Sequence, residues 1–166
     1  MGFLTKLASA SAVCFGLVSQ AQAFDLNGSH YADVRGWRVV QNQFGGSGYV
    51  PGTGPSVIFN TAPAGGWQMI FVDPAHYGDV PGVVDVEKYS FGDTFYVDDG
   101  YAYGGFDLSL RKSVGQGRML YADIGGVRYE QSLRGSTTVL LKLEECWTRM
   151  SGWTTQPNKA PTRAFK

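Results

Sequence analysis

The stretch 127-VRYEQSLRGSTTVLLKLEECWTRMSGW-153 contains the strongest helical pattern in the chain. Apolar side chains recur in it at the i, i+3, i+4, i+7 spacing of one buried helical face. These residues are Val139, Leu140, Leu143, Cys146, Trp147 and Met150. We therefore predict a helix over residues 137–150, about 20 Å long at 1.5 Å per residue, which lies across one face of a small sheet.

Both ends of this helix carry boundary signals. Ser136 is expected to be the N-cap, where its hydroxyl would accept a hydrogen bond from an amide of the first turn. Gly152 fits a left-handed C′ position, which would let Trp153 fold back against Trp147. Glu145 and Arg149 have the i, i+4 spacing that supports an exposed helical face.

The sequence outside this helix is rich in strand patterns separated by glycine. We expect strands at residues 36–42, 56–60, 67–72, 84–91, 94–98, 101–114, 118–124 and 127–133. The last five are separated by Gly92-Asp93, Asp99-Gly100, Gly115-Gln116-Gly117 and Gly125-Gly126, which suit tight hairpin turns.

Phe106, Leu108 and Leu110 alternate with polar residues, as in a half-buried antiparallel strand. Gly104-Gly105 within that run indicates a bulge or sharp coil. Residues 24–35 read as an irregular lead-in, and 44–55 and 73–82 as loops. The predicted class is mainly β: an antiparallel meander barrel or two-layer sandwich of about eight strands, with one C-terminal helix packed on it.

The N-terminus has the pattern of a signal peptide. Lys6 precedes an uncharged run at residues 7–18, and Ala21-Gln22-Ala23 supplies a small-x-small cleavage site. Cys14 would permit a lipoprotein, but Val13 stands where such signals carry a small residue. We expect cleavage after Ala23 and a periplasmic or secreted protein. Residues 24–153 would then form a single β-rich domain without a transmembrane span, and 154–166 a flexible tail.

Residues for catalysis or metal binding are sparse. The two histidines, His30 and His76, are far apart, and Cys146 follows two glutamates in the predicted helix, surroundings that raise a thiol pKa. Asp98, Asp99 and Asp107 lack the spacing of a calcium loop, and Asp99-Gly100 suits a turn. The sequence therefore assigns no catalytic, cofactor-binding or metal-ligating residue and implies no cofactor. Cys146 is expected to be a buried, reduced thiol.

Charge and aromatic residues are unevenly distributed. Residues 73–107 carry a net charge of −7 and residues 108–166 a net charge of +6. Interleaved hairpins would neutralise the two segments; the alternative is a dipolar molecule that associates head to tail or docks on a charged partner. No basic stripe indicates nucleic-acid binding.

Six tyrosines fall in the predicted meander: Tyr89, Tyr96, Tyr101, Tyr103, Tyr121 and Tyr129. An exposed row of them could stack on sugar rings or dock a protein partner. The alternative is that they fill the core and form cross-strand pairs.

Two short motifs carry a resemblance to a known group. Gly36-Trp37 opening the first strand, and Ser132-Leu-x-Gly-Ser136 ten residues before Cys146, resemble small exported envelope proteins of alphaproteobacterial type, whose function is unknown. The resemblance implies that the C-terminal cysteine pairs with one near the start of the sheet. Residues 45–49, Gly-Gly-Ser-Gly-Tyr, contain no cysteine, so this disulfide is absent here.

These observations favour a non-catalytic exported protein that acts as a binding or accessory module of the cell envelope, with a protein or carbohydrate partner. The alternative is a small hydrolase that acts on cell-wall or polysaccharide substrates through a carboxylate pair. The oligomeric state stays open.

Overall fold

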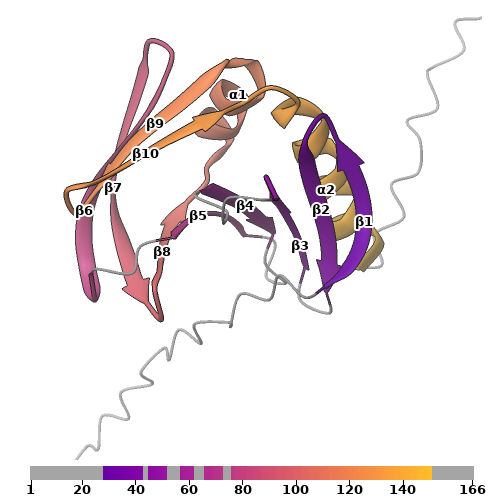
Figure 1. Ribbon diagram of the computed structural model, residues 1–166, viewed down its shortest axis with the longest axis horizontal. Helices are drawn as coiled ribbons and strands as arrows, with labels where there is room; N and C mark the ends of the chain where they lie inside the picture. The colour runs from indigo at the N-terminus through magenta and orange to yellow at the C-terminus, as the bar shows by residue number, and fades with distance from the viewer. Residues whose placement is uncertain (1–27, 43–44, 52–56, 62–65, 73–75, 151–166) are drawn as a thin grey trace, which may run out of the picture.

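The computed structural model describes residues 28–42, 45–51, 57–61, 66–72 and 76–150, with Met150 described by its backbone alone. Ten strands and two helices make up this part of the chain (Figure 1). The strands are β1 (Ser29–Val34), β2 (Trp37–Asn42), β3 (Gly45–Tyr49), β4 (Val57–Thr61), β5 (Trp67–Val72), β6 (Gly78–Val86), β7 (Tyr89–Asp98), β8 (Tyr101–Gly105), β9 (Met119–Ile124) and β10 (Val127–Ser132). The helices are α1 (Leu108–Gln116) and α2 (Ser136–Met150).

All ten strands belong to one antiparallel sheet in the order β1-β2-β3-β4-β5-β8-β7-β6-β9-β10, and the sheet is not closed. It curls strongly, so that β9 and β10 lie opposite β4 and β5 (Figure 1). Tyr129 of β10 crosses this space: its ring lies 4.9 Å from that of Phe71 in β5, and its hydroxyl donates to the Val72 carbonyl at 2.8 Å. The predicted class, mainly antiparallel β with a packed C-terminal helix, is confirmed.

The helix α2 covers the inner face of the sheet at β2, β3 and β4. Its side chains Val139, Leu143 and Cys146 are fully buried there. They lie directly on β3, because a Cβ atom added to Gly46 would stand 3.1 Å from the Cys146 Cβ, and one added to Gly48 would stand 2.4 Å from Val139 Cγ1. The glycines of β3 therefore provide the room in which α2 rests.

Three segments expected to be irregular are strands or begin one. Residues 45–49, predicted as part of a loop, form β3. Side chains of α2 occupy the space that side chains at the glycines of β3 would need. Residues 29–34 form β1, which pairs with β2 at one edge of the sheet that the described strands make. Residues 78–82 begin β6, which pairs with β7 on one side and β9 on the other.

The predicted strand at 101–114 is wrong in its second half. The strand β8 ends at Gly105, and α1 begins after Asp107, whose carboxylate accepts from the Leu110 amide at 2.7 Å. Leu110 and Val114, one helical turn apart, are buried, whereas Leu108 is 72% exposed. The alternation of Leu108 and Leu110 was therefore coincidental, and the cap at Asp107 decides the structure.

The hairpin order also differs from a simple meander. The strand β9 follows α1 and returns to pair with β6. A strand of the acidic segment 73–107 therefore pairs with a strand of the basic segment 108–166. The turn between β6 and β7 is Glu87-Lys88, and the predicted turn Gly92-Asp93 lies within β7. The predicted turns Asp99-Gly100 and Gly125-Gly126 are confirmed, with positive φ at all four residues.

The helix α2 begins one residue earlier than predicted. Ser136 is its first residue, and its buried hydroxyl donates to the Val114 carbonyl at 2.7 Å instead of accepting from an amide of the first turn. On the exposed face, the Glu145 carboxylate pairs with Lys142 at 2.8 Å, and the Arg149 guanidinium lies 5.4 Å from the centre of the Tyr31 ring.

Several predicted features lie outside the described residues. They are the signal peptide at 1–23, Cys14, the C′ glycine Gly152 with Trp153, and the tail at 154–166. Neither α1 nor α2 is long and apolar enough to cross a membrane.

Candidate functional site

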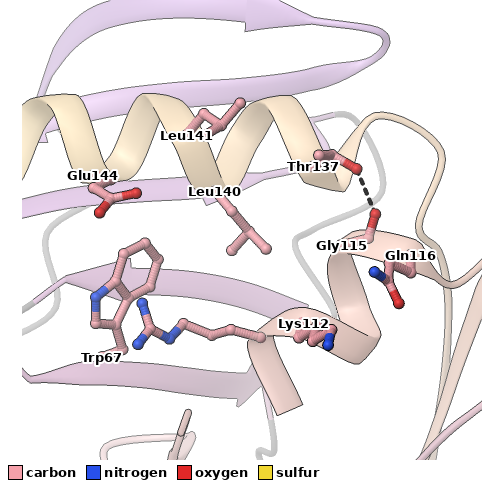
Figure 2. A pocket seen from close by; sticks show the side chains of 9 residues that line it. Trp67, Lys112, Gly115, Gln116, Thr137, Leu140, Leu141 and Glu144 are labelled. Atoms are coloured by element: carbon pink, nitrogen blue, oxygen red, sulfur yellow. Dashed lines mark hydrogen bonds between the residues drawn. The ribbon is translucent and has the colours of Figure 1, made fainter. Parts of the chain in front are cut away.

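A pocket of about 260 Å³ opens between α1, α2 and the start of β5. Figure 2 shows Leu140 pointing from α2 into this space, with Trp67 facing it from below. The residues that define its chemistry are Trp67, Arg111, Lys112, Leu140, Leu141 and Glu144. The pocket thus has apolar walls and a small number of charged groups, the usual make-up of a small-molecule site.

Two hydrogen bonds fix the distance between the helices at one end of the pocket. The Thr137 hydroxyl donates to the Gly115 carbonyl (Figure 2), and the Ser136 hydroxyl donates to the Val114 carbonyl. Both acceptors lie in the last turn of α1, where helical carbonyls have no partner within the helix. The start of α2 is therefore tied to the end of α1.

Arg111 lines the pocket and lies over an aromatic ring. Its guanidinium carbon is 4.5 Å from the centre of the Trp67 ring, a distance at which cation–π attraction contributes about 0.5–2 kcal/mol. The Trp67 ring in turn packs edge-on against Phe106 at 6.1 Å. Trp67 therefore covers one face of the guanidinium.

The Arg111 Nε is buried and lacks a hydrogen-bond acceptor among the described residues. A buried donor without a partner costs about 1–3 kcal/mol. Glu144 lines the same pocket, yet it forms no ion pair with Arg111 in the described part of the chain. The guanidinium therefore pairs with no carboxylate among the described residues.

Sequence reasoning missed this site. Trp67, Arg111 and Leu140 come from three elements that are distant in the sequence, and α1 was expected to be a strand. The visible signal was the cap at Asp107 followed by Leu110 and Val114 at i, i+4 spacing, which would have placed Arg111 on a helix.

A second groove of about 460 Å³ lies on the outer face of β6, β9 and β10. Tyr121, 49% exposed, stands at its centre. Asp85 of β6 and Glu130 of β10 are its direct cross-strand neighbours on either side, and Arg128 and Asp123 lie 4.0 Å apart at one edge. The groove is an exposed platform with carboxylates on both sides of an aromatic ring.

The six tyrosines of the predicted row divide between the two faces of the sheet. Tyr96, Tyr103 and Tyr121 lie on the outer face, and Tyr96 is the direct neighbour of Tyr103. Tyr101 lies on this face too, its ring 6.4 Å from that of Tyr103, and burial raises the pKa of Tyr103. Tyr129 is buried in the core, so the row is partly structural.

The remaining candidates are separated in space. Cys146 lies on the buried face of α2, and its burial raises its thiol pKa to about 11. His30 in β1 pairs with Asp33 at 3.1 Å, and His76 lies near Gly125. Within residues 28–150 as described, no three His, Cys, Asp or Glu side chains gather where they could hold a metal ion.

Comparison with protein-family models, with curated proteins and with solved structures finds no match. Function is therefore argued from the residues of this chain.

Proposed function

We propose that this protein is a non-catalytic binding module exported to the cell envelope, and that the pocket between α1 and α2 receives its ligand. The observation that carries the proposal is the Arg111 guanidinium, which lies over the Trp67 ring in the lining of a pocket that also contains Leu140 and Leu141. Among the described residues no carboxylate pairs with this cation, so an anionic ligand would gain a charge-assisted hydrogen bond.

Export is proposed from the apolar run at 7–18 and the Ala21-Gln22-Ala23 motif. The likeness of Gly36-Trp37 and of residues 132–136 to small exported envelope proteins supports the same destination. A Cβ atom added to Gly46 would lie 3.1 Å from the Cys146 Cβ, a position suited to the partner cysteine that this likeness implies. N-terminal sequencing of exported protein should begin at Phe24; lipid on Cys14 would overturn this proposal.

The binding proposal is tested with a neutral naphthalene dye, Prodan, whose fluorescence rises in apolar surroundings. Leu141 lines the pocket and is 55% exposed, and Leu108 is 72% exposed outside it. We expect wild type and Leu108→Glu to bind the dye with equal affinity. Leu141→Glu, which places a charge at the pocket mouth, should weaken binding about tenfold or more.

Thermal melts of both variants provide the control, because both substitutions are at exposed positions and should leave the melting temperature close to that of wild type. Equal dye binding by all three proteins, or none by wild type, would contradict the use of this pocket.

The alternative function, a hydrolase acting on cell-wall or polysaccharide material, has one observation in its favour. Asp85 and Glu130 flank Tyr121 two strand spacings apart, roughly 10 Å between backbones, so their carboxylates can approach a sugar from both sides. Both are exposed, whereas a catalytic acid is usually held in apolar surroundings. Release of reducing ends from peptidoglycan by wild type, lost in Asp85→Asn and Glu130→Gln, would establish the hydrolase instead.

A further inference from the structure

We propose that the ligand of the pocket between α1 and α2 is a small amphiphilic carboxylate, an anion with an apolar body. This inference rests on the proposed binding function and adds the chemical class of the ligand. It starts from the Arg111 guanidinium, which lines the pocket and forms no ion pair within the described residues.

The charged residues that line the pocket favour an anionic ligand. Arg111 and Lys112 contribute two positive charges and Glu144 one negative charge, so the lining has a net charge of +1. Stacking on Trp67 occupies one face of the Arg111 guanidinium and leaves its edge, where the N–H groups project in the plane. A carboxylate presents two oxygens that match two such N–H groups.

The leucines that line the pocket favour a ligand with an apolar part. Leu140 projects into the space between the helices (Figure 2), and Leu141 adds an apolar surface beside it. The pocket of about 260 Å³ is more than a carboxylate alone can fill, and burial of apolar ligand surface against the leucines would add affinity. Acetate therefore lacks most of the contacts, and a neutral alcohol of equal length lacks the ionic contact.

The test is isothermal titration of the full-length protein with octanoate, octanol, octylamine and acetate, each as a free compound below its aggregation concentration. We expect octanoate to bind about tenfold or more tightly than octanol, because its carboxylate forms charge-assisted hydrogen bonds. Octylamine and acetate should bind more weakly still.

Arg111→Gln should reduce the affinity for octanoate about tenfold or more, with the affinity for octanol nearly unchanged. Arg128→Gln is the matched control, since this side chain is 91% exposed on the outer face of β10, and it should leave both affinities unchanged. If Arg111→Gln fails to fold, the wild-type preference for octanoate over octanol decides the proposal.

Equal binding of octanoate and octanol would overturn the ligand class. If Leu141→Glu still weakened both, the pocket would remain the binding site, and only the present inference would fail. If no probe bound, or if Leu141→Glu had no effect on any of them, the binding function of this pocket would fail as well.

Discussion

The two sides of α2 are packed in opposite ways. Toward β3, the helix lies on glycines, and Val139, Leu143 and Cys146 are fully buried against a strand that has almost no side chains. Toward α1, the same helix is tied by Ser136 and Thr137 at one end, and its Leu140 borders a pocket of about 260 Å³. One side has no room for a methyl group, and the other has room for a ligand.

The difference shows where the chain tolerates empty space. Packed protein interiors lose stability with each cavity. On the β3 side, glycines let α2 approach the strand so closely that its side chains fill the space. The α1 side keeps an unpaired Arg111 Nε and an open volume. The following experiments test the contrast between the two sides.

Leu143→Ala should have the largest effect. Leu143 is fully buried at the centre of the β3 side, and its loss leaves a cavity that costs about 2–5 kcal/mol. Glu144→Ala, the next residue and exposed, should be near neutral for stability. Urea unfolding of the two variants checks this, and equal losses would mean that the buried face of α2 is wrongly assigned.

Gly48→Val tests the close contact directly. A Cβ atom there would lie 2.4 Å from Val139 Cγ1, and overpacking of this kind costs about 1–3 kcal/mol. The matched control is Gly92→Val in β7, where nothing lies within 4 Å of an added Cβ. This control should keep wild-type stability in urea melts or gain slightly from the strand propensity of valine. If Gly48→Val were as stable as the control, α2 would not rest on β3.

Cys146→Ala should have the smallest effect on stability, a loss of about 1 kcal/mol from reduced apolar burial. In native protein at neutral pH the thiol should resist alkylation, as judged by intact mass, because it is fully buried. Rapid labelling without denaturant, or a disulfide-linked dimer, would contradict the buried position.

The thiol also gives a pH dependence with a defined sign. Burial raises the pKa of Cys146 from 9.0 to about 11, so the unfolded chain loses this proton first as the pH rises. Its contribution to stability is complete below pH 9 and is lost between pH 9 and about 11, with a slope of at most about 1.4 kcal/mol per pH unit. The stability difference between wild type and Cys146→Ala should shrink over this range; an unchanged difference would refute the shift.

The sequence predicted α2 to within one residue, together with the mainly β class and two of the tight turns. These features depend on local signals: the helical period of Val139, Leu143 and Cys146, and the positive φ that Asp99-Gly100 and Gly125-Gly126 adopt. The strand β3 could not be recognised from the sequence. Strands are predicted from large apolar side chains, and β3 needs glycine at the positions where α2 rests on it.

The pocket could not be predicted for a different reason. Its residues come from β5, α1 and α2, and only the fold brings Trp67 under Arg111. The alternation of Leu108 with Leu110 resembled a strand, while the capping carboxylate of Asp107 indicated a helix. Recognition of that cap would have corrected α1, but it would not have shown which residues face α2.

The most direct test of the account is a disulfide between β3 and α2. The Cβ position of Gly46 lies 3.1 Å from the Cys146 Cβ, close to the roughly 3.5–4.5 Å of natural disulfides. Gly46→Cys should therefore oxidise to a monomer without free thiols, as shown by intact mass and a thiol-reactive reagent in denaturant. Ser47→Cys, whose side chain points to the opposite face of β3, is the control and should keep two thiols. Two free thiols in oxidised Gly46→Cys, or a disulfide-linked dimer, would contradict the placement of α2 on the glycine strand.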